Sequence, residues 1–318
     1  MAGSIVYSMR YATLRDMRLA HLAVLVAVVA CSSSPAAVTP PDPANHTFGG
    51  DRPVPLIRVP DKYDRGKPVS LVLMLHGYGS DALQTNVLFG LQYIADAENI
   101  LLVGPEGTVN SKGSHFWSAT DACCDFEHTG VDDVKYLTDL VKEVKQYYAV
   151  DPKRVFAVGV SNGGFMALRL ACDASDVFSG VVSYAGAGYL DASKCVPKEP
   201  VAVLQIHGTA DGTVPYAGGT LSGGVYPGIT VTLPPVSQTV GDWVKRDGCS
   251  PTPDTSQPPI DLIAELPGAE TKLQVWNGCA GSSQVKLASI EGGGHVNLGI
   301  ASTFPGFAWP FLRDHAKK

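Results

Sequence analysis

The sequence carries little charge and no excess of basic residues. Charged side chains make up 17% of the 318 residues, and 24 Lys and Arg stand against 30 Asp and Glu. Nucleic-acid-binding proteins usually present a basic face, so this balance argues against that class. No period of three or seven residues recurs, which excludes a collagen-like or coiled-coil chain. The hydrophobic fraction of 45% excludes a largely disordered one.

The apolar run near the N-terminus is too short to cross a membrane. Leu22–Ala30 would rise only about 14 Å as a helix, against a hydrocarbon core of about 30 Å. Three arginines precede it, so residues 1–30 are predicted to be an export signal. A small residue followed by Cys31 resembles the bacterial lipoprotein signal, in which this cysteine is lipidated. A plain signal peptide with an incidental cysteine is the alternative.

Composition changes after this signal. Residues 31–55 are rich in Ser and Pro and show no apolar periodicity, so we expect a tether. Residues 56–318 then form one domain by size. We expect this domain to be held at the bacterial cell envelope, at the outer membrane or cell surface, and to meet the membrane only through the lipid anchor.

Six cysteines remain beyond the lipidated one, an even set that suggests disulfides in an exported chain. They are Cys123, Cys124, Cys172, Cys195, Cys249 and Cys279. The expected pairs are Cys172 with Cys195 and Cys249 with Cys279. A bond between the neighbours Cys123 and Cys124 would close a strained ring, so a reduced pair is the alternative, and the sequence leaves their redox state open. No Cys-x-x-Cys occurs and the histidines are scattered in sequence, which argues against a zinc site.

Continuous apolar runs alternate with helical patterns along the chain. Runs of this length that are apolar on both faces predict buried parallel strands. They cover residues 69–75, 100–105, 154–161, 180–185, 201–207 and 285–290. Residues 131–148 follow helical spacing, and Asp132 and Asp133 at their start are expected only to favour the helix dipole. The alternation predicts an α/β fold: a doubly wound, mostly parallel sheet with helices on both faces.

A serine lies between one predicted strand and the helix that follows. Gly159-Val160-Ser161-Asn162-Gly163 has the G-x-S-x-G pattern of a nucleophile elbow. The turn is tight, so the residues two before and two after the serine must be small. The sequence therefore predicts Ser161 as a nucleophile.

A serine hydroxyl needs a base, and in this fold the chain order is serine, acid, histidine. Asp211 follows the strand at 201–207, and His295 follows three glycines after the last strand. The rival acids are Asp173, Asp176 and Asp191, and the rival bases are His207 and His315. His207 ends a strand and is expected to be a core or loop-pinning residue.

An oxyanion needs two N–H donors. The backbone amide of Asn162, directly after the nucleophile, is predicted as one. The amide of Tyr78 is predicted as the other, because Gly77 and Gly79 let the loop turn an amide into the site. A simple strand-to-helix turn is the alternative for this loop.

Several segments together resemble secreted polyhydroxybutyrate depolymerases and feruloyl-esterase-type proteins, which belong among the carbohydrate-esterase α/β-hydrolases. The segments surround the motifs above and also include Cys123-Cys124, Trp243–Cys249 and Cys279–His295. The resemblance runs from about residue 56 to the C-terminus in the same motif order.

This resemblance implies an α/β-hydrolase fold and an enzyme that hydrolyses carboxylic esters outside the cytoplasm. The implied triad is Ser161, Asp211 and His295, without metal or organic cofactor. The resemblance also favours the second disulfide named above. Many relatives carry Trp-Pro-Gly soon after the histidine, whereas this chain has Val296–Gly299. The resemblance therefore does not determine which residues form the wall that faces the substrate.

Substrate specificity is the least determined property. Tyr216, Trp117 and Trp243 are candidate contacts for a ring or polymer. The ester could be a hydroxyalkanoate oligomer or a feruloylated or acetylated polysaccharide. Two other functions fit the same motifs: a carbohydrate-binding lipoprotein that has lost catalysis, and a peptidase of the same fold.

Overall fold

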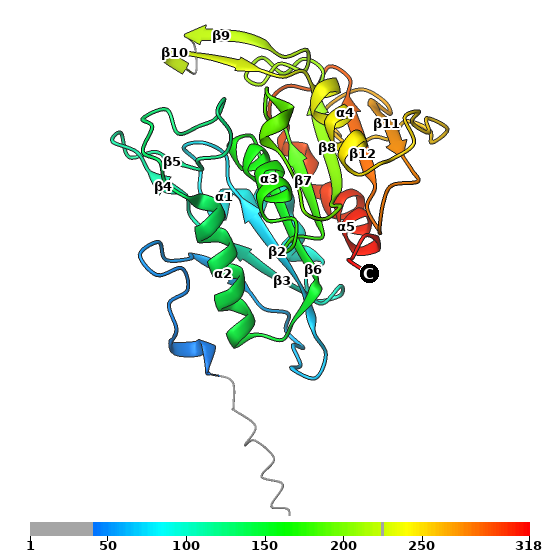
Figure 1. Cartoon of the computed structure of the whole chain (residues 1–318). Helices are drawn as coiled ribbons and strands as arrows, with labels where there is room; N and C mark the ends of the chain where they lie inside the picture. The colour runs from blue at the N-terminus through cyan, green and yellow to red at the C-terminus, as the bar shows by residue number, and fades with distance from the viewer. Residues whose placement is uncertain (1–40, 224–225) are drawn as a thin grey trace, which may run out of the picture. The chain divides into compact units, whose positions relative to one another are not determined.

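The computed structural model describes residues 41–223 and 226–318 of the chain (Figure 1). The predicted signal at residues 1–30 and the predicted lipidation site Cys31 lie outside the described residues. Within these two ranges, no helix combines the length and apolarity that a membrane crossing requires.

Eight strands form one sheet in the order β1-β3-β2-β6-β7-β8-β12-β11. The six inner strands are parallel, and they are buried apart from the first half of β6 and one residue of β12, which confirms the six predicted runs. Their bounds are β2 Val69–Leu75, β3 Ile100–Gly104, β6 Val150–Val160, β7 Gly180–Tyr184, β8 Ala202–Gly208 and β12 Val285–Ile290.

Helices cover both faces of the sheet because its strands are apolar on both faces. Along β2, Leu71 and Leu73 pack into one core, while Val72 and Met74 pack into the other. The first core is closed by α2 Asp133–Tyr147, α3 Asn162–Asp173 and α4 Val236–Arg246, and the second by α1 Ala82–Phe89 and α5 Phe304–Asp314 (Figure 1). The doubly wound prediction is confirmed.

The remaining strands were not predicted. Both edge strands run antiparallel to their neighbours, and two short hairpins lie outside the main sheet. The edges are β1 Leu56–Arg58 and β11 Thr271–Trp276; the hairpins are β4 Thr108–Val109 with β5 His115–Phe116, and β9 Gly219–Gly223 with β10 Tyr226–Leu233. Four 3₁₀ turns complete the described elements: η1 Pro43–Asn45, η2 Leu91–Tyr93, η3 Ala192–Lys194 and η4 Leu298–Ser302.

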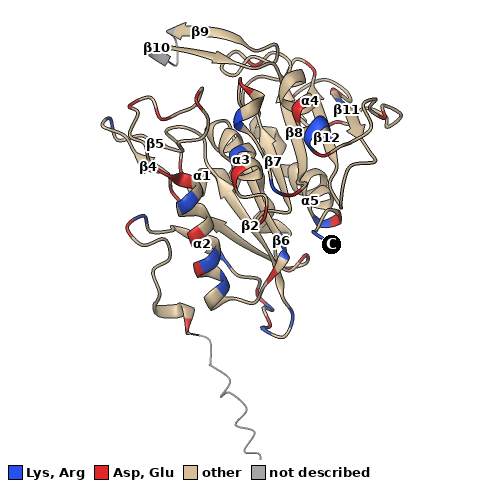
Figure 2. Cartoon of the chain, viewed as in Figure 1, with Lys and Arg blue, Asp and Glu red and all other residues tan. Residues whose placement is uncertain are grey.

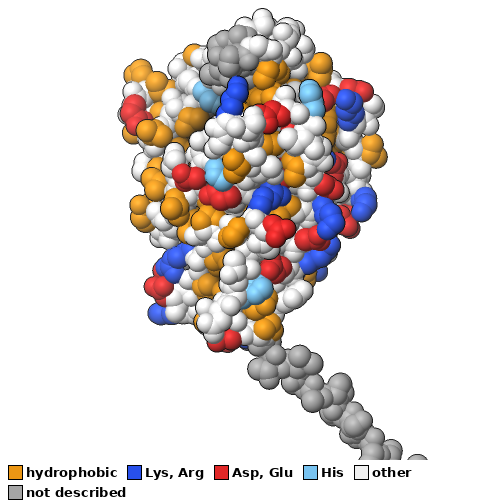
Figure 3. Space-filling view, turned by 90° about the vertical axis from the view of Figure 1, so that its left-hand side faces the viewer, with side chains coloured by type: hydrophobic (Ala, Val, Ile, Leu, Met, Phe, Trp, Pro, Cys, Tyr) orange, Lys and Arg blue, Asp and Glu red, His pale blue; other side chains and the backbone are white. Residues whose placement is uncertain are grey.

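The two acids at the start of α2 have different roles. Asp132 caps the helix by accepting the Lys135 N–H at 2.9 Å. Asp133 is fully buried and pairs with Arg52 at 2.7 Å, so the expectation that it only favours the helix dipole is wrong. Burial raises the pKa of Asp133, and the Arg52 charge opposes that rise. Farther along α2, basic and acidic side chains alternate (Figure 2). Charges of both signs are also interspersed on the face of the molecule that Figure 3 shows.

Described residues before position 56 pack against the domain. The compact unit spans Pro40–Lys318. Phe48 is only 5% exposed and belongs to the core that α2 closes. His46 stacks on Tyr147 with ring centroids 4.1 Å apart and meets Glu143 at 2.7 Å. The segment joins the domain because its aromatic rings find apolar partners on α2, which a Pro-rich composition does not reveal.

Three disulfides are present among the described residues. Cys172 is bonded to Cys195 and Cys249 to Cys279, as predicted. Cys123 is also bonded to Cys124, a pair whose redox state the sequence left open.

We predict that Asp247 makes stability depend on pH. Its side chain is fully buried at the end of α4, and burial raises its pKa to about 7 from 3.8. Between pH 3.8 and about pH 7, the Asp247 carboxyl is deprotonated in the unfolded chain but still protonated in the folded chain. The free energy of unfolding therefore falls as the pH rises through this range. Asp247→Asn should remove this decline and stabilise the protein at pH 8 by about 1–3 kcal/mol.

Urea unfolding at pH 5 and pH 8 measures this effect. The exposed Asp51→Asn variant is the control and should follow the native protein at both values. Equal pH dependence in the native protein and Asp247→Asn would contradict the prediction.

Candidate active site

Ser161 lies in the sharp turn between β6 and α3. Its backbone has φ 53° and ψ −121°, a conformation that residues other than glycine rarely adopt. The two flanking glycines allow the turn. A Cβ on Gly159 would lie 1.9 Å from the Gly163 carbonyl oxygen, and one on Gly163 would lie 2.0 Å from that of Leu75. The turn leaves the Ser161 hydroxyl at the carboxyl edge of the sheet.

His295 reaches this hydroxyl from the loop after β12. Its Nε2 lies 2.8 Å from Ser161 Oγ, and its Nδ1 lies 2.8 Å from Asp211 Oδ2. The loop is fastened to the one after β8, because the Gly292 N–H donates to Thr209 Oγ1 at 2.9 Å. The structure thus brings together three side chains that are 50 and 84 positions apart along the chain.

Asp211 is buried and held as a carboxylate. Its Oδ1 accepts the backbone N–H groups of Thr213 and Val214, each at 2.8 Å. Burial opposes ionisation, but hydrogen bonds from His207 and His295 outweigh it and hold the pKa of Asp211 well below its usual range. A carboxylate in this position can orient an imidazole and stabilise its charged form.

The rival residues have other surroundings. His207 is fully buried, and its Nε2 lies 2.8 Å from the Val214 carbonyl oxygen and 3.3 Å from Asp211 Oδ2. It fixes the Asp211 loop and does not approach Ser161. The rival acids all have exposed side chains, namely Asp173, Asp176 and Asp191.

The Asn162 amide opens α3. The first helical bond runs from the Phe165 N–H to the Ser161 carbonyl oxygen at 3.0 Å. The amides before it therefore lack an acceptor within the helix, as at any helix start. The Asn162 N–H directly follows Ser161 and suits the stabilisation of negative charge there.

The Tyr78 amide is fixed by its neighbours. Gly77 lies against Ser161, since a Cβ on Gly77 would be 3.5 Å from the Ser161 Cβ. The Gly77 carbonyl oxygen accepts from His76 Nδ1 at 2.7 Å and from the Ser80 N–H at 3.1 Å. In a trans peptide the next N–H points the opposite way, so these bonds set the direction of the Tyr78 amide.

His76, Glu106 and His115 form a cluster that the spacing of histidines in the sequence did not indicate. Their potential metal-ligand atoms all lie within 4.8 Å of one another. His76 Nδ1 bonds the Gly77 carbonyl, however, and His76 Nε2 accepts the Gly107 N–H at 2.9 Å. The electron pair that a metal would need is therefore occupied. Burial lowers the pKa of His76 to about 4, which suits this neutral, loop-pinning ring.

Two of the three predicted aromatic contacts do not face a substrate. Trp117 and Trp243 are 0% and 1% exposed, so the expectation that they stack on a ligand is wrong. Both are core residues, the usual place for a large apolar ring. Tyr216 is half-buried and its hydroxyl bonds Ser289 Oγ at 2.7 Å. Its contact with substrate stays a prediction.

Two cavities share part of their walls, and one of them is lined by Tyr78. One has a volume of about 380 Å³ and is lined partly by Tyr78, Phe116 and Phe126. The second, of about 430 Å³, shares Phe126 and Ile229 with the first. Ile229 comes from the β9–β10 hairpin, so segments far apart in sequence build these walls. In the sequence, only Phe126, the aromatic residue that follows the cysteine pair, could have indicated these cavities.

The sheet, the elbow and the Ser–His–Asp arrangement are those of an α/β-hydrolase. The fold resembles that of an acetyl xylan esterase from Aspergillus awamori with a TM-score of 0.58 at 15% identity, over 85% of this chain and 98% of that one. Residues 62–227, just over half of the chain, match the family described as Phospholipase/Carboxylesterase. The chain belongs to this family and is thus a carboxylic ester hydrolase by class.

Two esterases illustrate which proteins this chain is similar to in sequence. Putative esterase NocK from Nocardia uniformis subsp. tsuyamanensis is 30% identical over 247 residues, which cover 77% of this chain and 68% of the relative. Feruloyl esterase B from Piromyces equi is 26% identical over 244 residues, covering 76% of this chain. This match spans only 42% of the length of feruloyl esterase B. The resemblance to esterases of these kinds is confirmed.

Asp211→Asn should lower kcat for p-nitrophenyl acetate by about 1000-fold or more, with little change in KM. The variant keeps the shape of the side chain but loses the charge that stabilises a protonated His295. Steady-state kinetics measure the effect. Asp173→Asn, on an exposed rival acid, is the control and should retain native activity. More than a tenth of native kcat in Asp211→Asn would contradict the role of this carboxylate.

Proposed function

We propose that this protein is an exported serine esterase that works through an acyl-enzyme. The observation that carries the proposal is the continuous chain of 2.8 Å contacts from Ser161 through His295 to Asp211. A nucleophile in reach of a base, and a base oriented by an acid, is the arrangement that nucleophilic catalysis requires.

The reaction follows from the positions of these groups. Ser161 Oγ attacks the ester carbonyl carbon while His295 Nε2 takes the hydroxyl proton. Asp211 stabilises the resulting imidazolium. The carbonyl oxygen becomes an oxyanion, and the amides of Asn162 and Tyr78 donate to it.

Collapse of this intermediate expels the alcohol, which takes its proton from His295. Water then attacks the acyl-enzyme with His295 again as base, and the acid leaves as Ser161 recovers its proton. Each step uses groups of this chain and requires no cofactor.

We propose plant-polysaccharide esters or hydroxyalkanoate oligomers as substrates. The cavity beside the Tyr78 loop supports an acyl group with an aromatic ring, because Tyr78, Phe116 and Phe126 line it and its volume of about 380 Å³ exceeds that of a single small ring. The names of the feruloyl and acetyl xylan esterase relatives are consistent with polysaccharide esters.

Ser161→Ala should abolish hydrolysis of p-nitrophenyl acetate, methyl ferulate and hydroxybutyrate trimer, while thermal unfolding stays unchanged. Initial rates and circular dichroism measure the two properties. A fluorophosphonate probe should label the native protein and leave Ser161→Ala unlabelled. The control is Ser193→Ala, at an exposed serine, which should keep both activity and label.

The same panel separates the alternatives. A native protein that neither turns over esters nor takes the label would be a binding protein on a hydrolase fold. Cleavage of peptide amides in preference to these esters would indicate a peptidase. Either result would reject the proposed esterase.

We further propose that the protein is anchored to the cell envelope through a lipid on Cys31. The disulfides support an oxidising compartment, and the signal pattern before Cys31 supports export. Cys31→Ala should move the protein from the membrane fraction to the soluble fraction. Unchanged fractionation would contradict lipidation while leaving the esterase proposal intact.

A further inference from the structure

Trp117 lies between the two segments that supply the proposed oxyanion amides. It directly follows β5 and is completely buried. It therefore touches no substrate. Its polar groups instead face Asn162 on one side and His76 on the other.

The contact with Asn162 is a double hydrogen bond. The Trp117 N–H donates to Asn162 Oδ1 at 2.7 Å, and Asn162 Nδ2 donates back to the Trp117 carbonyl oxygen at 2.8 Å. Both partners are fully buried. The Asn162 side chain thus fixes the residue whose own backbone N–H is a proposed oxyanion donor.

The contact with the other segment is made by the indole. Trp117 Nε1–H donates to the His76 carbonyl oxygen at 3.1 Å, and the two rings lie 4.9 Å apart. His76 in turn holds the Gly77 carbonyl, which sets the direction of the Tyr78 amide. Trp117 therefore contacts both halves of the proposed oxyanion site, the Asn162 side chain through its backbone and the His76 carbonyl through its indole.

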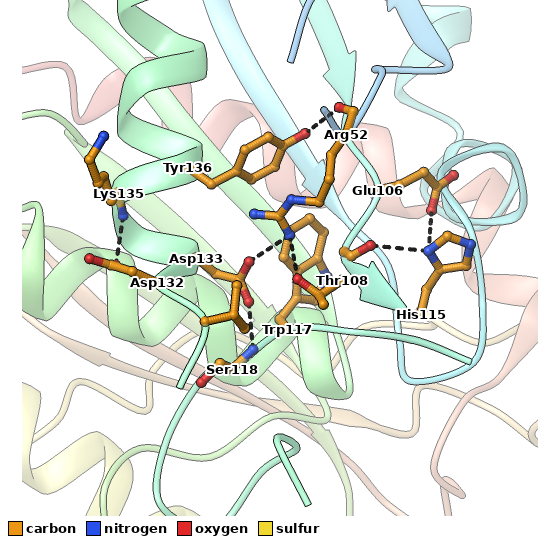
Figure 4. A network of polar contacts seen from close by, with 12 residues as sticks. Arg52, Glu106, Thr108, His115, Trp117, Ser118, Asp132, Asp133, Lys135 and Tyr136 are labelled. Atoms are coloured by element: carbon orange, nitrogen blue, oxygen red, sulfur yellow. Dashed lines mark hydrogen bonds and ion pairs between the residues drawn. The ribbon is translucent and has the colours of Figure 1, made fainter. Parts of the chain in front are cut away.

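The backbone directly after Trp117 is bonded to a buried ion pair. The N–H of the next residue, Ser118, donates to Asp133 Oδ2 at 2.7 Å. Asp133 Oδ1 accepts from Arg52, which also donates to Thr108 Oγ1 at 3.0 Å, before the β4–β5 turn (Figure 4). This network fixes the Trp117 backbone against α2.

We propose that Trp117 is a positioning residue that sets the spacing of the Asn162 and Tyr78 amides. The inference rests on the proposed serine-esterase function. Oxyanion bonds reach full strength only in the transition state, so displaced donors should slow the chemical step and leave ground-state binding nearly unchanged.

Two variants test the two arms separately. Trp117→Phe removes the indole N–H but keeps a buried ring. Asn162→Ala removes both hydrogen bonds between the Asn162 side chain and the Trp117 backbone but keeps the Asn162 backbone N–H. Each should lower kcat for p-nitrophenyl acetate by about 10- to 100-fold, with KM within about twofold. Affinity for a trifluoromethyl ketone, which forms a tetrahedral adduct at the serine, should fall in parallel with kcat.

Trp309→Phe is the matched control. Trp309 is also buried, at 1% exposure, and its Nε1–H donates to Glu98 Oε2 at 2.7 Å on the opposite face of the sheet. This variant loses an equivalent hydrogen bond without a link to Ser161, so its kcat and inhibitor affinity should match the native values.

The outcomes distinguish this inference from the proposed function. Native kcat in both Trp117→Phe and Asn162→Ala, with Ser161→Ala inactive, would overturn the positioning role alone. Equal losses in Trp309→Phe would overturn it too, because they would show a general packing effect. A native protein without Ser161-dependent turnover would overturn both proposals.

Discussion

The turn that carries Ser161 is the constraint on which the site depends. It holds a residue with a side chain at positive φ, and it does so because neither Gly159 nor Gly163 has a Cβ to meet the crossing backbone. The same turn ends β6 and begins α3. A strand end, a hydroxyl and a helix start therefore coincide, and an unbonded amide stands directly beside the nucleophile.

The sequence determines the inner sheet well. Parallel strands between two helical layers are apolar on both faces, so their runs stand out in the sequence. The convergence of Ser161, Asp211 and His295 was equally predictable, because loops after parallel strands all arrive at one sheet edge. Ser161 directly follows β6, and Asp211 and His295 lie in the loops after β8 and β12.

Other features depend on what a side chain meets, which the sequence does not state. β11 is exposed on part of one face, so its pattern is weaker than that of an inner strand. An aspartate at a helix start is usually solvated, yet Asp133 is buried against Arg52. A tryptophan near a motif can stack on a ligand or fill a core, and Trp117 does the latter. In each case distant residues decide the outcome.

The packing of the N-terminal segment gives the domain an orientation. His46 stacks on Tyr147 at the end of α2, just before β6 begins, so the described chain enters at the amino edge of the parallel strands. Ser161 stands at the carboxyl edge. A pull applied through the residues before Pro43 would act on the side opposite the hydroxyl. The proposed attachment at Cys31 would therefore hold the domain from the sheet edge that lies opposite Ser161.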